Sequence, residues 1–104
     1  MIGEAMHIKG DYNSRVVTLD GKMLSPVASQ KISNHSPDGF NWGYGGSGPS
    51  QLALGILNHK YGKDIALKYY QQFKWDFIVD WEYNFDVDID IDEWLNIQKE
   101  KSND

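Results

Sequence analysis

Cysteine is absent from the 104-residue sequence, and arginine occurs once, as Arg15. Without cysteine the protein cannot be a disulfide-stabilised scaffold or use thiolate chemistry, and the lack agrees with a reducing, cytoplasmic location. No apolar run approaches the roughly 18 residues that a membrane-spanning helix needs, so no membrane span is expected. The N-terminus also lacks the basic and apolar segments of a secretory signal. One cytoplasmic domain, residues 1–104, is the prediction.

Positive charge is unevenly distributed as well as scarce. Residues 1–62 carry five basic and four acidic side chains, a balance of +1, whereas residues 63–104 carry five basic and eleven acidic ones, a balance of −6. Nonspecific binding of duplex nucleic acid needs several phosphate-neutralising cations, so direct duplex binding is not expected. The near-neutral half remains compatible with an anionic ligand.

Two turn signals organise the N-terminal half. "RVVTLDGKML" predicts a hairpin with Asp20-Gly21 at its turn, because this pair suits the positive φ angles of a two-residue hairpin loop. "SQKISNHSPDGFNW", residues 29–42, predicts a strand, a turn at "SPDG" and a second short strand. These segments would supply the sheet.

Helical patterns dominate the rest of the chain. The first predicted helix has Gly48 as N-cap, Pro49 as first residue and Gly62 as its stop, and is largely apolar. Gly55 inside it indicates a close packing contact. A second helix is predicted from Asp64 to about residue 79, an extended segment around residues 83–89 and a last helix from about Asp92.

The predicted fold class is α+β. A small antiparallel sheet or hairpin in the N-terminal half is packed by two to three helices. Period-2 and period-3.6 patterns overlap from residue 75 to residue 79, so the boundary between helix and strand stays open there.

Four of the ten glycines fall within residues 43–48, directly before the first helix. Their spacing fits G-x-G-x-x-G, but no βαβ unit surrounds it, and Pro49 stands where a phosphate loop requires lysine. The match to a dinucleotide-binding domain is therefore weak, and an NTPase is excluded.

Two interpretations of this loop carry equal weight: tight packing, or contact with an anion through free backbone N–H groups at the start of a helix. In the second, aromatic side chains would stack on a planar group, hydroxyls would donate hydrogen bonds and His35 or Arg15 would add a cation. The candidate ligand-binding residues are Phe40, Trp42, Gly43, Tyr44, Gly45, Gly46, Ser47, Ser50, Gln51, His35 and Arg15.

The run "GFNWGYGGSGPSQLA" followed by "FKW" resembles a family of proteins of about a hundred residues found in bacteria, archaea and phages, a domain of unknown function. The resemblance covers about residues 7–95 and implies no particular chemistry. The occurrence in phages implies a role in host–phage conflict and, for a phage protein, the host cytoplasm.

Other motifs favour structural interpretations. "HSPDG", with His35, Ser36 and Asp38, is more typical of a turn than of a hydrolase triad, because adjacent residues rarely point at one another. The ladder Asp86, Asp88, Asp90 and Asp92 fails the calcium-loop template, since Ile91 and Ile97 occupy the positions of its glycine and glutamate. A solvated edge strand is favoured over a mimic of DNA phosphates. No metal, cofactor or catalytic residue is predicted.

The leading hypothesis is a non-enzymatic binding module for a small phosphorylated, nucleotide-like ligand, which in a phage would sequester an immune-signalling nucleotide. The alternative is an inhibitor that binds a host protein through exposed aromatic residues and the acidic C-terminal third. The aromatic surplus is also compatible with a homo-oligomer.

Overall fold

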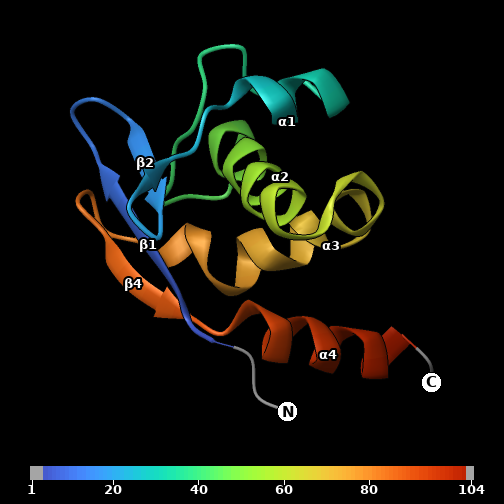
Figure 1. Ribbon diagram of the computed structural model, residues 1–104. Helices are drawn as coiled ribbons and strands as arrows, with labels where there is room; N and C mark the ends of the chain where they lie inside the picture. The colour runs from blue at the N-terminus through green and yellow to red at the C-terminus, as the bar shows by residue number, and fades with distance from the viewer. Residues whose placement is uncertain (1–3, 103–104) are drawn as a thin grey trace.

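The computed structural model describes residues 4–102 and places a four-stranded antiparallel sheet against a group of helices (Figure 1). The sheet has the order β3-β2-β1-β4. Its strands are β1 Met6–Asp11, β2 Val16–Leu19, β3 Lys22–Met23 and β4 Asp86–Ile89. The helices are α1 Val27–Ile32, α2 Ser47–Tyr61, α3 Lys63–Asp76 and α4 Ile91–Ser102, with a 3-10 turn, η1, at Ile78–Asp80. The α+β fold class is thus confirmed, with four α-helices where two to three helices were expected.

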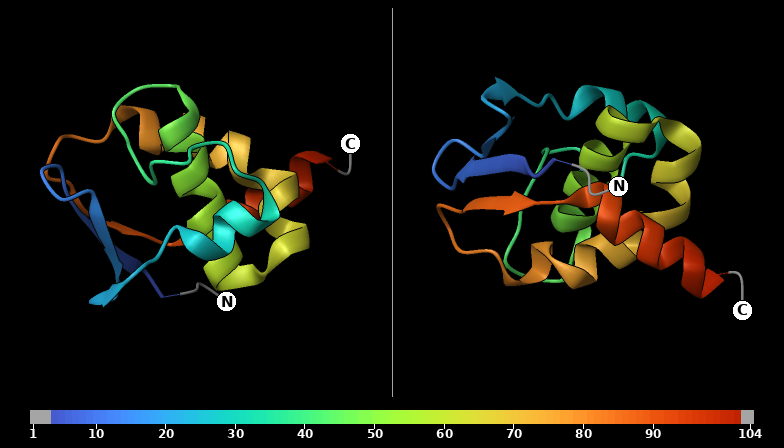
Figure 2. Two further views of the ribbon diagram at one scale, coloured as in Figure 1. Left: turned by 90° about the horizontal axis from the view of Figure 1, so that it is seen from above. Right: turned by 60° about the horizontal axis from the view of Figure 1, so that its bottom comes forward.

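The predicted hairpin is present as β2 and β3. Asp20 and Gly21 have φ angles of 50° and 84°, as a hairpin turn of this type demands. The fourth strand comes from the far end of the sequence, and β4 lies beside β1 (Figure 2, right). In this pair Ile8 is opposite Val87. β4 is an edge strand, so the solvated-edge interpretation of Asp86 and Asp88 is correct for these two residues.

Residues 29–42 do not form the predicted strands. The segment begins inside α1, and the remainder is loop, although the "SPDG" turn is present, with the Gly39 N–H donating to the Ser36 carbonyl at 3.1 Å. Pro26 lies at the N-cap of α1 with a helical φ of −71°. The Ser29 hydroxyl also donates to the Pro26 carbonyl at 2.7 Å. These local contacts, and the tertiary bonds of Gln51 described below, outweigh the strand pattern of a short segment.

Helix α2 is the centre of the molecule. Its residues from Gly48 to Leu57 are all buried, as the largely apolar sequence predicts. At Gly55 a Cβ atom would lie 3.1 Å from the Phe40 ring, so the close contact expected there exists. The N-cap is Gly46, two residues earlier than predicted, because Pro49 is tolerated anywhere in the first turn, where the N–H has no helical partner.

The C-terminal boundaries differ from prediction by one to three residues. Helix α3 begins after Gly62 and ends at Asp76, where the chain enters η1 instead of continuing to residue 79. Helix α4 begins at Ile91, and its inner face includes the buried Trp94, Leu95 and Gln98. No helix in residues 4–102 is long and apolar enough to cross a membrane.

Candidate functional site

The loop between α1 and α2 is held in place by one buried side chain, Gln51. Its Oε1 accepts hydrogen bonds from the backbone N–H groups of His35 and Ser36, at 2.8 and 3.0 Å. Its Nε2 donates to the Ser29 hydroxyl at 2.9 Å and to the Ser33 carbonyl at 3.2 Å. Gln51 is fully buried, and this amide has no hydrogen-bonding capacity left for a ligand. Gln51 therefore holds the loop in position and does not contact a ligand.

Two of the glycines admit protein side chains at close range. A Cβ atom at Gly45 would lie 2.5 Å from the Trp75 ring, and one at Gly46 would lie 2.4 Å from the Tyr44 ring. The buried Lys74 also donates to the Gly45 carbonyl at 3.3 Å. The space beside Gly45 and Gly46, which the anion-binding interpretation gave to a ligand, is therefore occupied by aromatic rings. Packing explains these two glycines.

The first turn of α2 is exposed to solvent at Ser47 and buried at the residues that follow. Ser47 is exposed, whereas Gly48 and Ser50 are buried. Ser50 is bound internally, with its N–H and its hydroxyl both directed to the Gly46 carbonyl at 3.2 Å. Among residues 4–102, no side chain caps the start of the helix by a hydrogen bond. The N–H group of Ser47 is thus the one that an external anion would meet.

A hollow of about 430 Å³ lies at this exposed start of α2. We call it the polar hollow. It is bounded by the β1–β2 turn on one side and by residues 36–48 on the other, and its lining is mostly polar. The lining residues are Asn13, Arg15, Ser36, Asp38, Gly39, Phe40, Asn41, Tyr44, Ser47 and Gly48.

Arg15 reaches the polar hollow from the β1–β2 turn. Its φ of 62° is that of a left-handed turn residue, and its N–H donates to the Asp11 carbonyl at 2.7 Å. The guanidinium carbon lies 3.6 Å from the centre of the Tyr12 ring, which orients the side chain by a cation–π contact. Arg15 forms no ion pair with any residue from 4 to 102. The only arginine therefore presents an unneutralised charge to the hollow.

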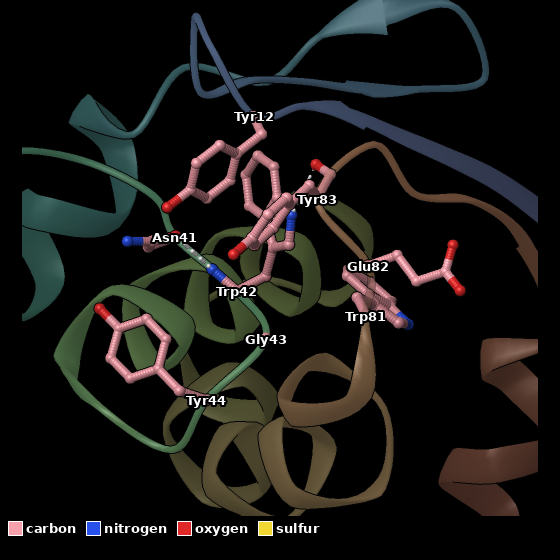
Figure 3. A pocket seen from close by; sticks show the side chains of 8 residues that line it. All are labelled: Tyr12, Asn41, Trp42, Gly43, Tyr44, Trp81, Glu82 and Tyr83. Atoms are coloured by element: carbon pink, nitrogen blue, oxygen red, sulfur yellow. Dashed lines mark hydrogen bonds between the residues drawn. The ribbon is translucent and has the colours of Figure 1, made fainter.

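A second hollow, of about 480 Å³, adjoins the first, because Asn41 and Tyr44 line both. We call it the aromatic hollow (Figure 3). Its rings come from the β1–β2 turn, the loop before α2 and the segment after η1. The lining residues are Tyr12, Asn41, Trp42, Gly43, Tyr44, Trp81, Glu82 and Tyr83.

The eleven candidate residues fall into three groups. Arg15, Phe40, Tyr44 and Ser47 line the polar hollow, and Trp42, Gly43 and Tyr44 line the aromatic one. His35, Gly45, Gly46, Ser50 and Gln51 line neither of these two hollows.

His35, in the last group, was expected to offer a cation to the ligand. Its ring lies 5.3 Å from that of Tyr70, and its Nε2 atom is buried without a hydrogen-bond partner among the described residues. Because His35 lines neither hollow, its imidazole is not placed to contact a ligand in either of them.

Sequence reasoning missed several lining residues. Asn13, Asp38 and Asn41 in the polar hollow, and Trp81 and Tyr83 in the aromatic one, were not among the candidates, although Asp38 lies in the "HSPDG" turn and Asn41 in the family motif. Their common feature is proximity to a turn or to the end of an element, which is where binding residues concentrate. The sequence contains no signal that brings the Tyr12 turn and the Tyr83 segment together.

The acidic ladder is divided among unrelated contacts. Asp86 binds His7 and lies 3.9 Å from Lys9, Asp90 accepts from the Glu93 N–H at 3.1 Å, and Asp92 accepts from the Tyr61 hydroxyl. Within residues 4–102 no three His, Cys, Asp or Glu side chains are grouped so as to hold a metal ion.

The chain belongs to a family whose sequence profile matches residues 8–97 and is described as "Family of unknown function (DUF6166)". Neither curated proteins nor solved structures gave a match. The family resemblance seen in the sequence is thus confirmed.

Proposed function

We propose that this protein is a non-enzymatic binding module for a small phosphorylated, nucleotide-like molecule, with the anionic group in the polar hollow. The observation that supports it is the convergence of the unneutralised Arg15 with the uncapped first turn of α2. Arginine is suited to phosphate because its planar donors match the phosphate oxygens. The positive end of the helix dipole adds to the same potential.

The lining also favours a particular kind of anion. Asp38 lines the same hollow and has no ion-pair or hydrogen-bonding partner among the described residues. Its carboxylate repels a bare anion but accepts hydrogen bonds, and Asn13 and Ser36 add neutral polar groups. A phosphate attached to a hydroxylated sugar satisfies both charges, because the phosphate faces Arg15 while the hydroxyls donate to Asp38.

Such a binder needs neither a metal nor a general base. In a phage, such a binder would serve to sequester a signalling nucleotide in the host cytoplasm.

Isothermal titration with AMP, ADP-ribose, a cyclic dinucleotide and inorganic phosphate tests the proposal. Arg15→Met removes the charge and retains an unbranched apolar stem, and it should weaken nucleotide binding about tenfold or more. Lys22→Met removes an exposed cation on β3, outside both hollows, and is the matched control. Failure of every compound to bind, or equal affinity of the Arg15→Met variant, would overturn the proposal.

A second candidate function is inhibition of a host protein, and the open edge of β4 favours it. The Gly10 N–H donates to the Phe85 carbonyl at 2.9 Å, so in antiparallel alternation the backbone groups of Asp86 and Asp88 face outward. Trp75 on α3, 56% exposed, is an aromatic residue of the exposed kind that this candidate requires. Asp86→Asn with Asp88→Asn should then release the partner in a pull-down, and retained binding would count against this candidate.

A further inference from the structure

The aromatic hollow is lined mainly by aromatic side chains, and phosphate binding in the polar hollow gives no reason for them. Five rings, those of Tyr12, Trp42, Tyr44, Trp81 and Tyr83, converge on it from three separate parts of the chain. Tyr44 is 48% exposed and Tyr83 is 70% exposed. Large aromatic side chains at this exposure around a hollow are typical of a recognition surface.

The rings are already ordered by contacts with one another. Tyr83 stacks on Tyr12 with centroids 4.3 Å apart, and Trp81 stacks on Phe85 at 4.2 Å. The Trp42 indole N–H donates to the Tyr83 carbonyl at 3.0 Å, which ties the loop before α2 to the segment after η1. Arg15 covers the outer face of the Tyr12 ring and Phe85 is buried, so the exposed Tyr83 and the half-buried Trp81 are the rings of these pairs on which a planar ligand can stack.

One polar group within the hollow has an unused donor. Asn41 accepts the Trp42 N–H on its Oδ1 atom at 2.9 Å, and its Nδ2 atom has no partner among the described residues. In Figure 3 this amide lies between the hydroxyl ends of Tyr12 and Tyr44. A ligand with a hydrogen-bond acceptor on the edge of an aromatic ring would satisfy it, whereas a purely hydrocarbon ring would not.

A cationic ligand fits less well. Aromatic cages for ammonium groups need the quadrupoles of several rings and gain from a nearby carboxylate. Glu82 lines the hollow, but in Figure 3 its carboxylate turns away from the Tyr12 and Tyr44 rings. Arg15 lies against Tyr12 as well, which places positive charge beside the rings.

We infer that the aromatic hollow binds the nucleobase of the ligand whose phosphate occupies the polar hollow. This inference rests on the proposed function for the phosphate end alone. Asn41 and Tyr44 line both hollows, so a base, sugar and phosphate can extend from one into the other. Stacking binds the base, and the Asn41 amide donates to an acceptor on its edge.

Titrations with AMP, adenosine and ribose 5-phosphate separate the two hollows. AMP should bind at least tenfold more tightly than ribose 5-phosphate, and adenosine should quench the tryptophan fluorescence through its contact with Trp81. Tyr83→Leu should lower the AMP affinity about tenfold and leave ribose 5-phosphate binding unchanged, because Tyr83 lines only the aromatic hollow of the two. Tyr83→Phe retains the ring and is the matched control.

The outcomes distinguish this inference from the proposed function. Equal affinities for AMP and ribose 5-phosphate, or no effect of Tyr83→Leu, would overturn the base site and leave the phosphate site standing. Adenosine binding without any binding of ribose 5-phosphate would remove the phosphate site and support the base site. Binding of decaproline, lost in Tyr83→Leu, with no response to adenosine would assign the hollow to a peptide and overturn the inference.

Discussion

At the scale of single residues, Gln51 matters more to the fold than to a ligand. Its amide bonds to four groups on α1 and on the loop before α2, and this loop forms one side of both hollows. The positions of Asn41 and Tyr44 therefore depend on a side chain that lines neither hollow. A buried glutamine with all its partners satisfied is a strong local constraint because each broken bond leaves a buried polar group unpaired.

Gln51→Leu should lower the free energy of unfolding by about 2–4 kcal/mol, because it removes four hydrogen bonds and leaves the Ser36 N–H without its partner, while the His35 N–H and the Ser33 carbonyl keep only their bond to each other. Urea denaturation measures the change. Gln71→Leu, on the exposed side of α3, is the matched control and should shift stability by less than about 0.5 kcal/mol. Similar stability of the two variants would contradict the role given to Gln51.

The sequence identifies some site residues and not others, for a physical reason. Tyr44 and Ser47 were predictable because they lie beside a helix start that glycine and proline mark. Arg15 was predictable as the only arginine. Asn41 and Asp38 were not, because their role depends on a fold that brings a distant turn against them. Gln51 was assigned to a ligand because a glutamine near a helix start gives no indication of which way its amide points.

At the scale of elements, the strongest local signals were the most reliable. The Asp20-Gly21 hairpin and helix α2 follow from turn chemistry and from a long apolar run. Helix α1 was mistaken for a strand because six residues are too few for periodicity to decide, and its stability derives in part from Gln51. The pairing of β4 with β1 joins residues about 80 positions apart, which no local pattern encodes.

The contact between these two strands has a measurable pH signature. The hydrogen bond from His7 lowers the pKa of Asp86, and Lys9 contributes less. Because folding lowers this pKa, the stabilisation is present above the ordinary value of about 3.9 and is lost as the pH falls through the folded value. His7→Ala should raise the pKa of Asp86 toward its ordinary value in an NMR titration of the carboxyl carbon.

Lys9→Ala provides the comparison for this titration. Its effect on the pKa of Asp86 should be the smaller of the two, because the ammonium lies 3.9 Å away and makes no hydrogen bond to the carboxylate. A larger shift in Lys9→Ala than in His7→Ala would show that charge alone, and not the hydrogen bond, sets the pKa.

At the scale of the whole molecule, the two hollows lie where three connecting segments meet over a packed scaffold. The β1–β2 turn, the loop before α2 and the segment after η1 supply the lining, while the buried α2 and the sheet fix their ends. This division between a rigid core and ligand-contacting loops is common in binding proteins. In the glycine-rich loop, Gly45 and Gly46 pack against aromatic rings of the protein, whereas Ser47 is exposed to solvent.

The central claim is that the backbone N–H group of Ser47 at the start of α2 binds a phosphate, and a pair of variants at this residue tests it most directly. Proline suits the first helical position, and Gly46 before it has the extended φ and ψ of −92° and −161° that proline requires. Ser47→Pro thus removes one N–H and keeps the helix, whereas Ser47→Ala removes only the hydroxyl. In calorimetric titrations with AMP we expect about a tenfold loss of affinity for Ser47→Pro and little loss for Ser47→Ala. Equal affinities of two folded variants would contradict the account.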